Sequence, residues 1–305
     1  MGNKLKSFIG MAFVSIIWTS GFSEIINVLE VVGPFTLIFL RFFIAFLGLL
    51  VFQKILGIKE KIEDEDKTKL VINGLIGSIF YFAISNLTVM YLPTVDSAVI
   101  SSMQLILMLW AESMFLNKMI TPKRCFYVVM ATIGGILLMR TVYLSTSVLV
   151  AYMLMLIATC FWVCYNIIQI SILKKYKAST VIRYQSFYSL FFILPLILID
   201  NNNFSAINGT HIYSFLYLGL MGIAVGYTIN SYALKNIGPT NTSLLLIFQP
   251  VILLFSDLIF KARLFTLSDN VGIVLIAIAV LFMVIDMRKK NMYMDEGGFS
   301  DEYKI

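Results

Sequence analysis

Long apolar runs, separated by short polar segments, make up nearly the whole chain. Ten of these runs hold roughly 20 residues each, which lets an α-helix cross a hydrocarbon core about 30 Å thick. The pattern predicts ten membrane-spanning helices, over 8–28, 32–52, 69–90, 94–116, 122–140, 147–169, 180–199, 211–234, 239–260 and 267–287. We therefore expect an all-α integral membrane protein.

The two halves of the chain share a set of landmarks at nearly the same offset. Trp18, Arg41, Tyr81 and Pro93-Thr94 in the first half correspond to Trp162, Gln185, Tyr227 and Pro239-Thr240 in the second. Five spans in each half is an odd number, so the second copy enters the membrane upside down, an arrangement common among secondary transporters. We predict one repeat over 1–140, an inverted repeat over 141–290, and a disordered cytoplasmic tail over 291–305.

Composition and charge support this interpretation. With 59% apolar and only 13% charged residues, the chain has too little polar surface for a soluble globule of 305 residues. Most of its 23 Lys and Arg residues fall in segments on the N-terminal side of the membrane, whereas the opposite side holds only Arg140, Lys261 and Arg263. Such an imbalance places both termini in the cytoplasm. Richness in Lys, Asn and Ile suggests a bacterium with an AT-rich genome, and we expect the protein in its plasma membrane.

Motifs for enzymatic chemistry are absent from the sequence. It has no GxxxxGK[ST] phosphate loop, no GxSxG and no HExxH, and its single histidine, His211, cannot form a His-rich metal site. The basic residues lie between apolar runs and form no patch with stacking aromatics, so nucleic-acid binding is excluded. We expect no enzyme, no cofactor and no metal.

Polar groups inside apolar spans are costly in lipid and therefore face a partner or a water-filled cavity. In the helix predicted over 94–116, such groups recur every three or four residues, which places them on one inward-facing side: Ser97, Ser101, Gln104, Met108 and Glu112. In the helix over 239–260, Pro250 breaks the backbone beside Gln249. Both helices are therefore candidates to line an internal site.

Aromatic and amide side chains add further candidates. Trp18 and Trp162 lie in the middle of their spans, although membrane tryptophans concentrate at the interfaces. This placement is compatible with packing or with lining a cavity. Tyr227 and Asn230 lie among small residues that favour close helix contact, and their polar groups are candidates to meet a substrate.

Two ionisable residues stand out within the spans. Arg41 is either a structural anchor paired with Glu24 or Glu112, or a contact for an anionic substrate group such as a carboxylate. Glu112 lies near the cytoplasmic end of its helix, where it either reaches the interface, binds a substrate amine or couples transport to protons. The sequence leaves these alternatives open.

Three stretches resemble a known family. The segment IIWTSGFSEIINVLEVVGPFTLIFLRFFIAF (16–46), with Pro34, Arg41, Phe42 and Ala45, is similar to the first signature of the drug/metabolite transporter superfamily, EamA type. The segments CFWVCYNIIQISILKKY (160–176) and TSLLLIFQPVILLFSDLIFKARLFT (242–266) resemble the repeated signature. The resemblance covers roughly residues 8–286 and implies ten helices with both termini in the cytoplasm.

The resemblance also implies a central cavity walled by both repeats. Carried onto this chain, the cavity-wall role falls on Trp18, Gln104, Trp162, Tyr227, Asn230 and Gln249, with Arg41 as a family position. Where family members commonly read Leu-Gly-Glu, this chain reads Leu116-Asn117-Lys118 and Lys261-Ala262-Arg263. Both expected acids are bases here, which leaves Glu112 and Asp257 as the acids of the region.

Taken together, these features predict a secondary transporter that moves small metabolites, such as amino acids, across the plasma membrane by alternating access, with export as the expected direction. Its partners would be a small-molecule substrate, the lipid bilayer and, through Glu112, protons. The alternative is a flippase or scramblase for lipids or lipid-linked sugars. The sequence sets neither the substrate nor the oligomeric state.

Overall fold

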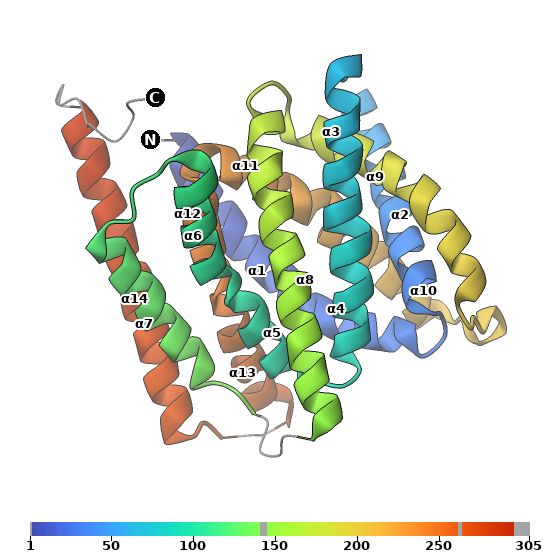
Figure 1. Ribbon diagram of the computed structural model, residues 1–305. Coiled ribbons are helices and arrows are strands. Elements are labelled where there is room, and N and C mark those ends of the chain that lie inside the picture. The colour runs from blue at the N-terminus through green and yellow to red at the C-terminus, as the bar shows by residue number, and fades with distance from the viewer. Residues whose placement is uncertain (1, 141–144, 262–263, 296–305) are drawn as a thin grey trace.

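The computed structural model describes residues 2–140, 145–261 and 264–295, and within these ranges it contains helices and loops but no β-strand (Figure 1). The helical segments of the first half are α1 (Gly2–Leu29), α2 (Pro34–Ile55), α3 (Asp64–Leu75), η1 (Ile76–Phe80), α4 (Tyr81–Val89), α5 (Thr94–Ser102), α6 (Gln104–Leu116) and α7 (Pro122–Ile136). Those of the second half are α8 (Thr146–Leu173), α9 (Ala178–Ile193), η2 (Leu194–Ile199), η3 (Phe204–Ala206), α10 (Gly209–Leu216), η4 (Tyr217–Val225), α11 (Gly226–Ile237), α12 (Pro239–Leu246), α13 (Phe248–Lys261) and α14 (Leu267–Asp295).

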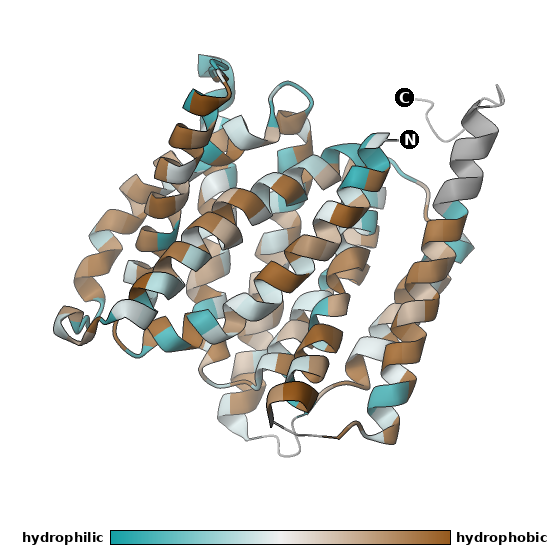
Figure 2. Cartoon of the chain, turned by 180° about the vertical axis from the view of Figure 1, so that it is seen from behind, coloured by the Kyte–Doolittle hydropathy of each residue, from teal (hydrophilic) through white to brown (hydrophobic). Residues whose placement is uncertain are grey.

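Length and apolarity make this an integral membrane protein. Among the described residues, nine helical stretches are long and apolar enough to cross a membrane. The tenth predicted helix, α7, is present but has only 15 residues. Figure 2 shows hydrophobic residues along much of the helices and hydrophilic residues gathered towards the helix ends and loops. The all-α membrane fold expected from the sequence is thus confirmed.

The halves are inverted and interdigitated. Helix α1 begins and α14 ends at the same face of the bundle, called here the N-terminal face, whereas α8 begins at the opposite face (Figure 1). The main helix contacts join one half to the other: α1 packs against α11, α2 against α9, α4 against α8, and α7 against α14. Any cavity at the centre of the bundle is therefore walled by both repeats.

Matching irregularities interrupt equivalent helices. The third helix of each half contains a π-helical stretch, η1 or η4, and such stretches are frequent at functional sites. The fourth helix of each half is interrupted, at Met103 between α5 and α6 and at Ile247 between α12 and α13. Pro250 explains the second interruption because it cannot donate to the preceding turn. At the first, the Ser101 and Ser102 hydroxyls bond to backbone carbonyls four residues earlier, which bends helices.

Several predicted helix ends differ from those in the structure; α1, for example, begins at Gly2 and not at 8. Helix α3 begins at Asp64, not at 69, because three acidic residues form its first turn and favour the positive end of the helix dipole. Pro195 turns the end of the predicted helix 180–199 into the 3₁₀ segment η2. Helix α14 continues to Asp295, into the predicted tail, whose residues 296–305 lie outside the described ranges.

Gly134 and Gly272 allow α7 and α14 to meet backbone to backbone. A β-carbon on Gly134 would lie 2.8 Å from the Gly272 carbonyl oxygen, while one on the neighbouring Gly135 would meet only Val99, at 3.9 Å. We expect Gly134→Ala to lower the free energy of unfolding by about 1–3 kcal/mol through overpacking. Gly135→Ala, the matched control, should leave it unchanged or raise it by up to about 1 kcal/mol. Equilibrium unfolding in detergent micelles measures both, and equal effects would contradict this account.

Candidate functional site

A cavity lies at the centre of the bundle between the two repeats. It encloses about 830 Å³ of space, its open mouth included, and its walls come from α1, α2, α4, α5 and α6 of the first half and α8, η4, α11, α12 and α13 of the second. On α1 the lining residues run from Ile17 to Ile25, in the half that approaches the opposite face. On α2, which begins at that face, the lining residue Arg41 lies in the first half, and on α8 the lining residues Met155 to Trp162 lie around the middle. The cavity is therefore displaced towards the opposite face.

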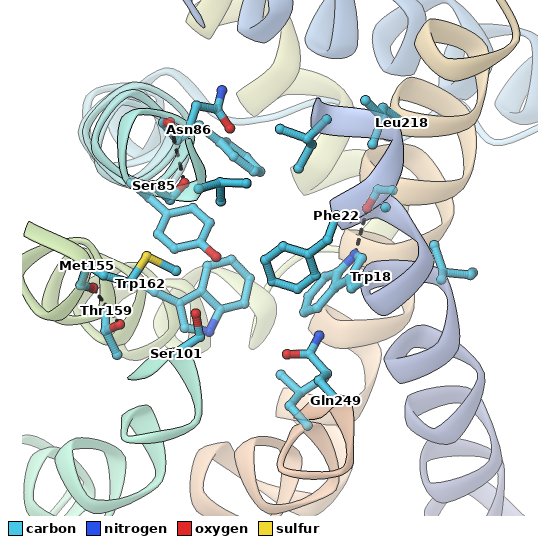
Figure 3. A pocket seen from close by; sticks show the side chains of 18 of the residues that line it. Trp18, Phe22, Ser85, Asn86, Ser101, Met155, Thr159, Trp162, Leu218 and Gln249 are labelled. Atoms are coloured by element: carbon cyan, nitrogen blue, oxygen red, sulfur yellow. Dashed lines mark hydrogen bonds between the residues drawn. The ribbon is translucent and has the colours of Figure 1, made fainter. Parts of the chain in front are cut away.

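Three aromatic side chains meet at the base of this cavity. The rings of Trp18, Trp162 and Tyr227 contact one another edge to face, with centroids 5.4 to 5.8 Å apart. The Trp18 indole Nε1 also donates to the Gly222 carbonyl across 2.9 Å, which fixes its orientation against the π-helical stretch. Figure 3 shows both tryptophans beside the same space. Trp18 and Trp162 therefore pack against other rings and also line the cavity, so both alternatives hold for them.

Arg41 brings a buried positive charge to the cavity wall. Its side chain is only 4% exposed, and its guanidinium lies 4.2 Å from the centre of the Phe82 ring. Its Nε and Nη1 atoms are buried and have no hydrogen-bond partner within the described ranges. Pairing with Glu24 or Glu112, one of the two alternatives for Arg41, is not found among the described residues: Glu24 accepts from the Ser214 hydroxyl, and Glu112 binds other cations. Helix rotation, which the sequence does not specify, directs these groups apart.

Gln104 and Gln249 occupy equivalent places in the two repeats. Each follows the interruption of its interrupted helix, at the start of α6 and of α13, and both side chains line the cavity. Gln104 Oε1 is buried without a partner in the described structure. In Figure 3 the Gln249 amide points into the space beside Trp18. The cavity thus has neutral amides at its wall in addition to the charge of Arg41.

Glu112 does not line the cavity. Its carboxylate, 1% exposed, lies 2.9 Å from Lys118 Nζ and 2.6 Å from Arg124 Nη2, and it accepts a hydrogen bond from the Thr240 hydroxyl. Thr240 belongs to the second repeat and the two cations to the first. We call these four residues the Glu112 cluster. It connects the repeats near the N-terminal face, and proton coupling through Glu112 stays a prediction.

Backbone geometry on both sides builds the Glu112 cluster. Asn117 ends α6 in the left-handed conformation, with φ of 53°, and the chain folds back so that the Lys118 N–H bonds to the Glu112 carbonyl. Gly238 ends α11 with φ of 82°, and a β-carbon there would lie 3.2 Å from Glu112 Oε1 and 3.0 Å from Lys118 Nζ. A side chain at Gly238 would thus be both strained and crowded.

Asn230 also lies outside the cavity. Its amide donates to Asn166 Oδ1 across 3.0 Å, which joins α11 to α8. One turn further towards the N-terminal face, Gln169 donates to the Ser231 hydroxyl, and Asn73 of α3 donates to Gln169. All five side chains are buried. The space between the cavity and the N-terminal face is therefore filled by polar contacts between helices.

The structure adds lining residues that sequence reasoning did not single out: Phe22, Phe82, Met155 and Thr159. Two of them had a detectable signal. Thr159 is a polar residue three positions before Trp162, and Phe82 lies three positions before Ser85, so each shares a helix face with another lining residue. Phe22 and Met155 are ordinary apolar span residues, and only the tertiary structure distinguishes them from lipid-facing ones.

The lining of the cavity is suited to recognition of a small molecule. Within the described residues, no group of three or more His, Cys, Asp or Glu side chains could hold a metal ion. The lining residues combine aromatic rings, neutral amides and hydroxyls with one guanidinium. Such a mixture of apolar walls and a few polar groups is typical of sites that bind small molecules.

A bundle of two inverted membrane repeats with a cavity between them is the architecture of a membrane transporter. The family model of the EamA-like transporter family matches residues 5–140 and 149–285, and the chain belongs to this family.

Two further similarities agree with this assignment. An uncharacterized transporter of Archaeoglobus fulgidus is 23% identical over 282 residues, which cover 92% of this chain and 99% of that protein. A protein of known crystal structure superposes with a TM-score of 0.73 over 93% of this chain and 98% of its own, at 12% identity. At that identity the second similarity shows the shared fold alone.

Proposed function

We propose that the protein is a secondary transporter that moves small metabolites across the plasma membrane, with both termini in the cytoplasm, by alternating access between its two repeats. The observation that carries the proposal is the central cavity, which both repeats wall and which is displaced towards the face opposite the termini. On the other side, buried polar contacts and the Glu112 cluster separate it from the N-terminal face. Rocking one repeat against the other would reverse this asymmetry.

Export is the proposed direction, and it rests on the resemblance to metabolite exporters. The arrangement of charge supports the orientation, since the Lys- and Arg-rich segments lie at the N-terminal face. No specific feature of the cavity favours lipids as cargo over small metabolites.

We expect proteoliposomes loaded with a mixed pool of metabolites to lose one chemical class faster than protein-free vesicles, as measured by mass spectrometry of the released compounds. Ser101→Phe, which adds a ring to the cavity wall, should reduce this selective loss about tenfold or more because ligand and ring compete for the same space. Met114→Phe introduces the same ring at an exposed position of the same transmembrane segment, away from the cavity, and should not change the selective loss. Folded protein with no selective release of any compound would contradict the proposal and direct attention to lipid translocation.

A further inference from the structure

The described lining of the cavity carries a positive charge without a negative one. Among its lining residues in the described part of the chain, Arg41 alone is charged, and no Asp or Glu is present. The nearby carboxylates are engaged elsewhere: Glu24 accepts from Ser214, and Glu112 belongs to the cluster near the N-terminal face. The cavity therefore presents one positive charge to a ligand and no negative one.

Arg41 is prepared for an anion. A buried guanidinium without hydrogen-bond acceptors is costly, and an anionic ligand that accepted from it would offset that cost. The planar fork of the guanidinium matches the two oxygens of a carboxylate. Its contact with the Phe82 ring holds the fork at the wall of the cavity rather than in lipid. A single carboxylate would neutralise the cavity, whereas a dianion would leave a charge unpaired.

The remaining walls specify the rest of the ligand. Trp18, Tyr81, Trp162 and Tyr227 offer ring faces and edges to an apolar or aromatic body. Gln104 Oε1, which is buried and unpartnered, can accept from a neutral donor such as a hydroxyl group. An ammonium group would enter beside the guanidinium and find no carboxylate at the wall, so like-charge repulsion and desolvation would oppose its binding.

Building on the proposed function, we propose that the substrate class is organic monoanions in which one carboxylate is joined to an apolar or aromatic body that carries hydroxyl groups but no ammonium group. Arg41 binds the carboxylate, and the aromatic side chains surround the body. Amino acids, in which an ammonium group lies next to the carboxylate, are discriminated against by the absence of an acid in the wall.

Four probes with the same phenyl body test the contributions of the carboxylate and of the ammonium group separately. They are 3-phenyllactate (carboxylate and hydroxyl), phenylalanine (carboxylate and ammonium), phenylalaninol (hydroxyl and ammonium) and 3-phenylpropane-1,2-diol (two hydroxyls). Trp18 and Trp162 line the cavity, and the third tryptophan, Trp110, is exposed on the outside of the bundle. In the full-length Trp110→Phe protein, indole fluorescence therefore reports binding at the cavity.

We expect 3-phenyllactate to bind about tenfold or more tightly than the diol, because hydrogen bonds to a charged group are stronger than neutral ones. Its affinity should exceed that of phenylalanine by a similar factor, and phenylalaninol should have the lowest affinity of the four. The proposal would be overturned if phenylalanine or phenylalaninol bound as tightly as 3-phenyllactate or more tightly. It would also be overturned if none of the four probes bound. In either case, selective release of another compound from proteoliposomes would leave the proposed transport function intact.

Arg41→Gln tests the assigned residue. It should bring the affinities for 3-phenyllactate and the diol to within about threefold of each other, chiefly by weakening the binding of 3-phenyllactate. Arg41→Lys, which keeps the charge but not the fork, should retain part of the preference. If Arg41→Gln misfolds, the probe series on the parent protein still decides the substrate class. A well-folded Arg41→Gln protein with an unchanged preference for 3-phenyllactate would overturn the role of Arg41.

Discussion

Replacing Asp269 with alanine is expected to lower the free energy of unfolding by about 3 kcal/mol or more, because it leaves the charge of Arg140 buried and unpaired. Asp269 is fully buried, and its Oδ1 lies 2.8 Å from Nη1 of Arg140, whose side chain is 9% exposed. The two side chains form an ion pair at the start of α14. Asp269 Oδ2 also accepts from the Thr266 N–H, and the Asp269 N–H donates to the Thr266 Oγ1, which makes a reciprocal cap at the start of α14.

Lys67→Ala provides the matched control, since it removes an ion pair with Asp64 that is exposed on both sides. Surface pairs of this kind contribute at most about 1 kcal/mol, so the free energy of unfolding should barely change. Equilibrium unfolding in mixed detergent micelles measures both variants. If Asp269→Ala were as stable as Lys67→Ala, the Arg140–Asp269 contact would not be what holds α14 to the end of the first repeat.

Replacing Glu112 with glutamine is expected to shift the protein towards a conformation open at the N-terminal face, by about tenfold in population. The substitution keeps the shape of the side chain but removes the charge that holds Lys118 and Arg124, and one hydrogen bond to a charged group is worth roughly 1.5–3 kcal/mol. Because the Glu112 cluster includes Thr240 of the second repeat, its loss favours separation of the repeats at that face. This prediction rests on the proposed alternating access.

Cysteine accessibility measures the shift. In a background without the three native cysteines, Ser231→Cys places a thiol in the buried region between the cavity and the N-terminal face, and Ser85→Cys places one in the cavity wall. With Glu112→Gln, a water-soluble maleimide should label position 231 about tenfold faster and position 85 more slowly. Glu30→Gln, which changes an exposed carboxylate, is the control and should alter neither rate. Unchanged labelling at both positions would show that the Glu112 cluster does not hold this face closed.

The spans and the inversion of the second half were predictable because each follows from a strong physical rule. A hydrocarbon core requires long apolar helices, and an odd number of them inverts the second copy. The interruption at Ile247 was also visible in the sequence through Pro250. The interruption at Met103 was not, because it depends on serine hydroxyls that bond to the backbone in one helical context and not in another.

The cavity residues were predictable only in part. The structure brings Trp18, Arg41, Gln104, Trp162, Tyr227 and Gln249 to one cavity, and it places Glu112 and Asn230 between helices nearer the N-terminal face. All eight are polar or aromatic residues inside apolar spans, which is the signal that identified them. That signal does not distinguish a group facing a cavity from one facing a neighbouring helix, since both environments satisfy polar atoms.

The sequence by itself determined the membrane class, the ten helices, their repeat and their inverted arrangement, because these follow from the length, number and polarity of its segments. Only the tertiary structure decided the pairing of charges. Glu112 meets Thr240 across 128 positions of the chain, and Arg41 has no carboxylate partner in the described part of the chain. The rotation and crossing of packed helices fix which side chains meet. Among the described lining residues, the buried guanidinium of Arg41 therefore says most about the charge of the ligand.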